Sequence, residues 1–187
     1  MPLNSLTNSV PASFITLMDN SSIMNSIKQY PQRNISYFKY KSEGLQLISD
    51  KKLDSLEGNA FEHSYMSAQL SIEYNVGTAD FLGWSQEIVL FLVRDVPKYV
   101  LDKNSTKLGN QMRESMGDIH NNEIGHKVGE LVMSGVLKRS QIADVLVGAI
   151  KTNQLIVDKI NDPRISKSEY QDPDFNLSKA MNYSGTN

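Results

Sequence analysis

One side chain that can exchange protons near neutral pH stands out in this chain because of where it occurs. His63 is one of only three histidines in 187 residues, and it directly follows an acid, Glu62. An imidazole titrates near neutral pH and binds metals when neutral, so His63 could serve as a general base or a metal ligand. The simpler alternative is a helix histidine packed against its neighbours and held by one hydrogen bond.

Two carboxylates and an amide complete the set of candidate catalytic residues. Glu87 lies in an otherwise apolar stretch, where a carboxylate is either at a helix edge in water or buried with a partner, because burial alone is costly. Asp118 and Asn122 are one helical turn apart, and such a pair can hold a water, orient a histidine or coordinate a hard metal. The alternative to a catalytic role is that Glu87 lies on the polar edge of a core helix. For Asp118 and Asn122, the alternative is that both hydrogen bond to a neighbouring loop.

Asp118 and Asn122 also begin a stripe that continues with two glycines. At 3.6 residues per turn, Asp118, Asn122, Gly125 and Gly129 fall on one side of a helix. Each glycine costs about 1 kcal/mol relative to alanine in a helix interior. The stripe therefore predicts close approach of another object, which is either a second helix or a ligand.

The sequence lacks the motifs of several large enzyme classes. It contains no zinc-protease HExxH, no GxSxG nucleophile elbow, no phosphate loop and no dinucleotide fingerprint. The absence of cysteine excludes disulfides and thiol chemistry. A net charge of −2 gives no argument for nucleic acid as a partner.

The N-terminus and the apolar segments bear on localisation. The first residues have neither the basic start nor the apolar run of a secretory signal. The longest strongly apolar run, residues 88–93, is far too short to cross a bilayer. We expect a protein made in the cytoplasm without a signal peptide, which leaves the cell only by a machine that needs none.

The candidate residues belong to a chain that is typical of a mainly α fold. We predict a single helical domain with an irregular N-terminal third (residues 1–58), a helical core (59–162) that carries the candidate site, and a loose polar C-terminal tail (163–187). Within the first segment, 35–40 alternates moderately, as a strand does. The core helices are expected at 59–75 with Asn59 as the cap, from Thr78 onward, at 110–134 with Gly135 as the stop, and at 140–160 after Ser140.

The motifs resemble a poorly characterised family of helical bacterial domains. The order here is Ala60-Phe61-x-His63-Ser64-Tyr65, then an apolar helix with Glu87, then Asp118-Ile-x-Asn121-Asn122-x-x-Gly125-x-x-x-Gly129. The family pattern is Phe-Arg-His-Ala-Tyr-Trp, then His-Glu, then Asp-x-x-Asn-Asn-x-x-Gly-Arg-x-x-Gly. The resemblance covers about residues 58–132. Members occur alone and at the ends of secreted proteins that resemble polymorphic toxins.

Three positions depart from the family pattern. Glu62 and His126 stand where the family has arginines, which argues against the same grip on an anionic ligand. Gln86 replaces a histidine, which weakens a metal site that needs two. The remaining matches and His126 imply a set of substrate-binding residues, namely Tyr65, Asn121, Gly125 and His126.

Two hypotheses of different classes follow. The first is an antibacterial effector or toxin with hydrolase activity, acting on a cell-envelope substrate through His63, Glu87, Asp118 and Asn122. A secretion machine would deliver it, an immunity protein or a component of that machine would be its partner, and a divalent metal is left open as a cofactor. The second is a non-enzymatic binding or structural protein, a phage or secretion-system component, whose Asp/Asn/Gly stripe specifies helix packing.

Overall fold

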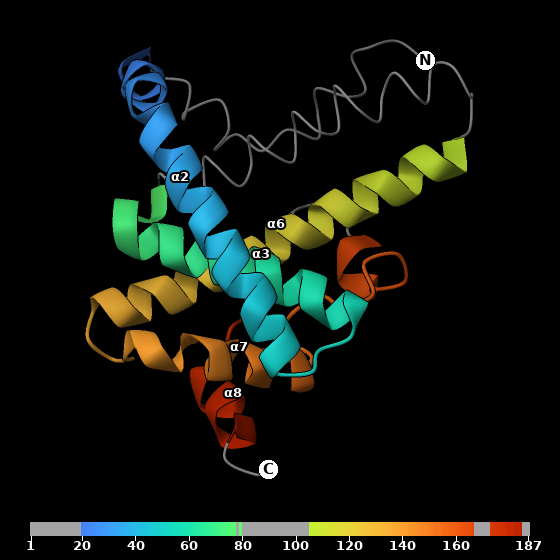
Figure 1. Cartoon of the computed structure of the whole chain (residues 1–187). Coiled ribbons are helices and arrows are strands. Elements are labelled where there is room, and N and C mark those ends of the chain that lie inside the picture. The colour runs from blue at the N-terminus through green and yellow to red at the C-terminus, as the bar shows by residue number, and fades with distance from the viewer. Residues whose placement is uncertain (1–19, 78, 80–104, 167–172, 185–187) are drawn as a thin grey trace.

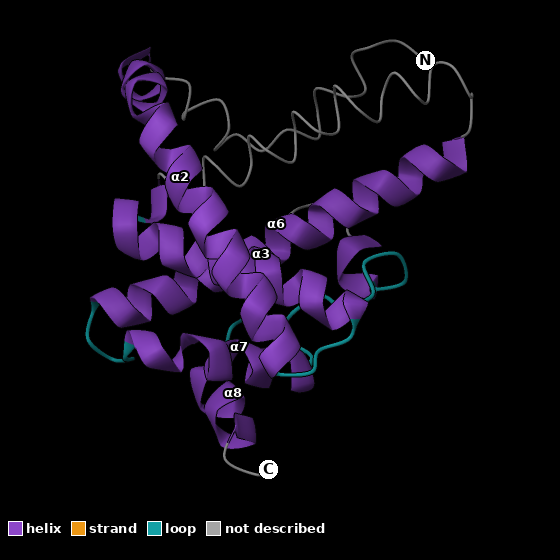
Figure 2. Ribbon diagram, viewed as in Figure 1, coloured by secondary structure: helices purple, strands orange, loops and turns teal. Residues whose placement is uncertain are grey.

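The structure is a computed structural model that describes residues 20–77, 79, 105–166 and 173–184 (Figure 1). Within these residues the chain forms helices and loops and no strand, which confirms the predicted mainly α fold (Figure 2). The elements are α2 (Asn20–Asp50), α3 (Ser55–Tyr74), α6 (Ser105–Met133), η4 (Arg139–Gln141), α7 (Ile142–Lys151), η5 (Pro163–Ser166) and α8 (Leu177–Ser184). None of the described helices is long and apolar enough to cross a membrane.

Helix α3 begins one turn earlier than the sequence pattern predicts. Asp54, rather than Asn59, is the N-cap, and its Oδ1 accepts hydrogen bonds from the backbone N–H groups of Leu56 and Glu57, both at 2.9 Å. Glu57 reaches back to the N–H of Asp54 and completes a capping box. Asn59 is thereby placed inside the helix, where its side chain is available for another contact.

Helices α3 and α6 pack closely along the predicted glycine stripe. A Cβ atom added to Gly125 would lie 2.2 Å from the carbonyl oxygen of Ser64, and one added to Gly129 would lie 2.8 Å from the Cβ of Ser71. The facing residues of α3 are also small, so the two backbones can approach. The glycine stripe predicted the close approach of either a second helix or a ligand, and in the structure the helix α3 lies against it. The surrounding core includes Phe61, Ala68, Ile124, Val128, Leu146 and Ala149.

The fourth predicted helix is shorter than expected. It ends at Lys151 instead of about residue 160, because Asn153 adopts a φ of 56° and the backbone N–H groups of Gln154 and Leu155 turn back to the carbonyl oxygen of Ala149. Residues 152–162 consequently cross back over α6 as an irregular segment. Helix α6 starts at Ser105, five residues before the expected start at residue 110. A φ of 77° at Gly135 follows the end of α6 as predicted.

The described part of the N-terminal region is the long helix α2, so the strand suggested for residues 35–40 is wrong. Buried Ser36, Tyr40 and Gly44 recur every four residues. This spacing puts them on one side of a helix, against α3. The hydroxyl groups of Ser36 and Tyr40 both donate to the carboxylate of Glu73 on α3. The contact between α2 and α3 thus includes polar bonds beside apolar packing, since Tyr40 also belongs to a buried apolar cluster with Met66 and Leu70 of α3.

Helix α8 adds a C-terminal element to the domain and packs against α7 (Figure 1). Ala180 is fully buried, and a Cβ added to Gly148 of α7 would lie 2.0 Å from the carbonyl oxygen of Ala180. The helix predicted from Thr78 onward, with the candidate Glu87, lies outside the described residues.

Candidate functional site

The candidate site is a polar cluster where α3, α6 and the segment after α7 meet. The Nε2 atom of His63 lies 3.3 Å from Oδ1 of Asp118. The ammonium group of Lys159 donates to the same Asp118 oxygen and to Oδ1 of Asn59. The side chains of His63, Asp118 and Lys159 are 21%, 12% and 10% exposed, so the cluster is mostly buried but reaches the surface.

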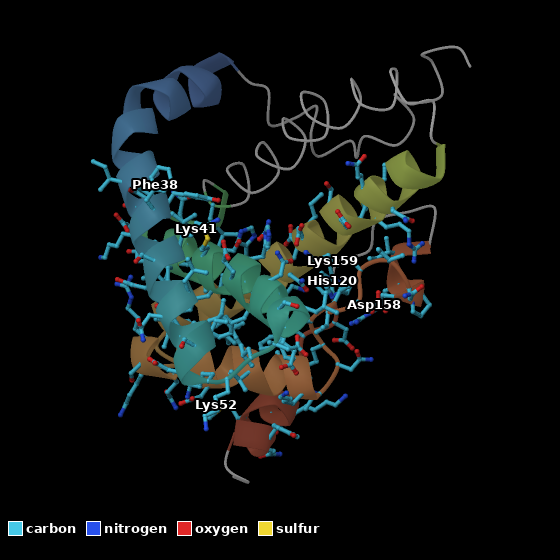
Figure 3. The ribbon with its side chains drawn as sticks, turned by 45° about the vertical axis from the view of Figure 1, so that its right-hand side comes forward. Phe38, Lys41, Lys52, His120, Asp158 and Lys159 are labelled. Carbon is cyan, nitrogen blue, oxygen red and sulfur yellow. The ribbon has the colours of Figure 1, made fainter. Side chains whose placement is uncertain are left out.

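Helical periodicity explains how two of the three elements contribute to the cluster. Asn59 and His63 are one turn apart on α3, and Asp118 and Asn122 are one turn apart on α6. Lys159 belongs to the irregular segment that follows α7 and lies beside α6 (Figure 3). The cluster therefore depends on a long-range contact that neither helix specifies alone.

A glycine outside the predicted stripe makes room for Lys159. A Cβ atom added to Gly117 would lie 2.6 Å from Cγ of Lys159 and 3.0 Å from its Cδ. The aliphatic part of the lysine thus packs against the backbone of α6, and its charged end reaches Asp118, the next residue along the helix.

Burial and charge together set the state of His63. Burial is the largest influence and lowers the pKa of the imidazole from the ordinary value of 6.5. The carboxylate of Asp118 acts in the opposite direction, the ammonium of Lys159 lowers the pKa further, and Glu62 and a hydrogen bond with Asn122 raise it. The net result is a lowered pKa, so His63 is mainly neutral at pH 7.

Asn122 connects the cluster to α3. Its side-chain oxygen accepts a hydrogen bond from the hydroxyl group of Ser67 at 2.9 Å, and the same side chain contacts the ring of His63. In this arrangement Asn122 orients the histidine, which is one of the roles that an acid–amide pair one turn apart can fill.

The segment that carries Lys159 is held on α6 by side chains that bind its backbone. Asn121 donates to the carbonyl oxygen of Ile156 at 2.9 Å and accepts from its N–H at 2.8 Å. His120 donates to the carbonyl oxygen of Gln154, and Arg113 donates to that of Ile160. These bonds satisfy backbone polar groups of a segment that does not form a regular helix.

Of the predicted site residues, the structure brings together His63, Asp118 and Asn122. Tyr65 is buried and donates to Glu43 of α2 at 3.3 Å. Gly125 contacts Ser64, and Asn121 binds the backbone of Ile156. The sequence analysis missed two members of the cluster, Asn59 and Lys159, because each was assigned to an ordinary position in a predicted helix. The one available signal for Lys159 was Gly117, a further glycine in the helix that carries the stripe.

His126 differs from the other candidates because no described residue hydrogen bonds to it. The residue is 2% exposed, and neither ring nitrogen has a hydrogen-bond partner among the residues that the structure describes. A carboxylate oxygen of Glu123, one turn away, is 3.8 Å from Nδ1, which is beyond hydrogen-bond distance. Such a group is costly to bury.

The described residues contain no group of three His, Cys, Asp or Glu side chains that could hold a metal ion. In the candidate site, His63 and Asp118 lie next to each other, and both are residue types that can bind a metal ion. The carboxylate of Asp118 is already paired with the ammonium group of Lys159. Glu87, the third predicted catalytic residue, lies outside the described residues, so the proposed convergence of all three groups stays a prediction.

Two partly buried histidines predict that the fold loses stability in mild acid. Burial is the main cause of a lowered pKa at both His63 and His120. A histidine with a lower pKa in the folded state binds fewer protons there than when unfolded. The free energy of unfolding should therefore fall as the pH drops below about 6.5, the ordinary histidine value.

Thermal unfolding of the wild type between about pH 7.5 and about pH 5.5 would measure this loss, since carboxylates with lowered pKa values, such as Asp162, titrate in more acidic solution. His63→Asn should flatten the dependence. An identical slope in the variant and the wild type would contradict the assignment to His63.

The family resemblance of the motifs stays a prediction. No family model, curated protein or solved structure matches the chain.

Proposed function

We propose that this chain is a small hydrolase of the antibacterial-effector type, with His63 as its general base. The observation that carries the proposal is the contact between His63 and Asp118, in which a mainly neutral imidazole lies 3.3 Å from a carboxylate at a partly exposed position. A base in its neutral form at working pH and oriented by an acid is the arrangement that general-base hydrolysis needs.

The roles of the side chains follow from their contacts. Asp118, whose Oδ1 lies 3.3 Å from Nε2 of His63, stabilises the imidazolium formed when the ring takes a proton from an attacking water. Asn122, itself fixed by Ser67, orients the ring. Glu87 is predicted to be an acid/base partner or a further metal ligand, and two carboxyl groups in different environments allow acid and base roles to be divided.

The cell envelope is proposed as the target on the strength of the sequence motifs. The motifs resemble those of domains found at the ends of toxin-like secreted proteins. An effector of this kind would need a secretion machine for its delivery and an immunity protein to protect the cell that makes it. Glu62 and His126, in place of two family arginines, argue against an anionic group bound in the same manner.

A second candidate is a non-enzymatic binding or structural protein. The observation that favours it is the packing of Gly125 and Gly129 against Ser64 and Ser71, which accounts for both glycines without a ligand. The buried ion pair between Lys159 and Asp118 can likewise serve a structural role. In this case the cluster would specify how three elements assemble.

The two candidates differ in what His63→Asn and Asp118→Asn do in living bacteria. For the hydrolase, expression of the wild type in the periplasm should arrest growth or lyse the cells, and each variant should remove that effect, because each removes the oriented base. Survival and turbidity of cells that express equal amounts of each protein would measure it.

A matched control separates chemistry from folding. Glu130→Gln changes an exposed acid on the same helix as Asp118 and should keep full toxicity. Removing one partner of a buried pair is destabilising by about 3–5 kcal/mol, so Asp118→Asn needs a circular dichroism spectrum like that of the wild type. A wild type harmless in periplasm and cytoplasm, or a folded His63→Asn that stays fully toxic, would overturn the proposal.

A further inference from the structure

We propose that Lys159 is a positioning residue for His63, because its ammonium fixes the carboxylate of Asp118 that orients the imidazole. Lys159 donates both to Asp118 and to Asn59, so it joins the segment after α7 to α6 and α3 in one cluster. The inference rests on the proposed function, since it assigns a role within that site. Lys159 acts through Asp118 and is not itself the base.

The local backbone is shaped to admit this lysine. Gly117 is the residue next to Asp118, and a Cβ there would lie 2.6 Å from Cγ of Lys159. A side chain at position 117 would displace the stem that carries the ammonium. At Gly109, in the same helix, no atom of the described residues lies within 4 Å of the place where a Cβ would be. The glycine at 117 is thus explained by the lysine, and not by helix packing.

The segment around Lys159 is held in place more firmly than an ordinary connection. Asn121 fixes Ile156 through both of its backbone polar groups. Arg113 binds the carbonyl oxygens of Ile160 and Asp162, at 2.5 and 3.0 Å. These bonds fall on both sides of position 159. A lysine carried by so constrained a segment presents its charge at a defined point, as a preorganised site needs.

The charges around His63 show what this ammonium does. His63 is faced by Asp118 from α6, by Lys159 from the segment after α7 and by Glu62 from its own helix. Glu62 is paired with Lys41 of α2 at 2.9 Å. Among the described residues, Lys159 is therefore the cation that balances Asp118. Without it, the carboxylate would act on the imidazole alone and make its protonated form more stable.

The inference is tested by NMR titration of the imidazole signals of the full chain. The three histidines give three signals, and His63→Asn identifies the one that belongs to His63. In Lys159→Met, the pKa of His63 should rise by about one unit, because one nearby cation is lost and Asp118 is released. In Lys159→Arg, which keeps the charge, it should stay closer to that of the wild type.

A second variant keeps the test decisive if Lys159→Met does not fold. Gly117→Ala leaves the lysine charged but pushes its stem aside, so the pKa of His63 should rise in the same direction by a smaller amount. Gly109→Ala is the matched control and should leave that pKa unchanged. A pKa of His63 that stays at the wild-type value in the folded variants of Lys159 and Gly117 overturns the inference.

The outcome is distinguishable from failure of the proposed function. A folded His63→Asn protein that keeps full toxicity removes the catalytic role of His63, whatever the titration shows. An unchanged pKa in the Lys159 and Gly117 variants, together with loss of toxicity in His63→Asn, removes only the role of Lys159. If both proposals hold, Lys159→Met should also move the acid limb of the pH–activity profile upward, and Lys159→Arg should restore it.

Discussion

Gly125→Ala should destabilise the domain by about 2–3 kcal/mol, the upper part of the range for an overpacked interior. The new methyl group would lie 2.2 Å from the carbonyl oxygen of Ser64 and 2.9 Å from the Cβ of Ser67. Neither atom is the end of a flexible side chain, so α3 and α6 must separate. The gain of about 1 kcal/mol in helix propensity is too small to offset this. Urea unfolding followed by circular dichroism would measure the difference.

The control for this prediction is on the same helix. Gly109→Ala places a methyl group in open space, so the helix-propensity gain should remain, with stabilisation of up to about 1 kcal/mol. The two substitutions are chemically identical and should have opposite signs. A Gly125→Ala protein as stable as the wild type would mean that α3 and α6 are not in backbone contact. The glycine stripe would then need the ligand that the sequence left open.

Asn121→Ala should cost about 3 kcal/mol, because it leaves two buried backbone groups without partners at roughly 1–3 kcal/mol each. Asn121 is fully buried, and its side chain both donates to and accepts from the backbone of Ile156. Alanine can do neither, and water reaches this position poorly. The same unfolding experiment would report the loss.

The consequences of Asn121→Ala should extend to the candidate site. The segment that carries Lys159 loses its central attachment to α6, so backbone amide exchange at residues 155–160 should become faster than in the wild type. Asn182→Ala, at an exposed position of α8, is the matched control and should change stability by no more than about 0.5 kcal/mol. Equal stabilities of Asn121→Ala and Asn182→Ala would contradict the assigned role.

The candidate site combines features of both proposed functions. His63 is oriented, mainly neutral and partly exposed, as a general base should be. Asp118 and Lys159 also join three elements of the fold, as a structural cluster would. These roles are compatible, because a preorganised site takes its rigidity from the same contacts that stabilise the fold. Measurements that separate activity from folding therefore decide between the functions.

The sequence predicted what depends on local periodicity. The repeat of apolar residues at helical spacing predicted a mainly α fold, and the i, i+4 relation of Asp118 and Asn122 placed both on one side of one helix. Because glycine is unfavourable in a helix interior, the two glycines correctly predicted that another element packs closely against the helix at Gly125 and Gly129. Helix ends were less accurate, since Asp54 acts through side-chain hydrogen bonds and Asn153 through a positive φ, neither of which the apolar pattern contains.

Only the tertiary structure decided which distant residues complete the cluster. Lys159 is 41 residues from Asp118 and 100 residues from Asn59, and its position depends on where α7 ends and on how the next segment returns over α6. No periodicity relates residues so far apart. Local spacing determines which side chains share a face of a helix, whereas the path of the whole chain determines what that face meets. His63 and Asp118 could therefore be named from the sequence, but the ammonium that joins them to the rest of the fold could not.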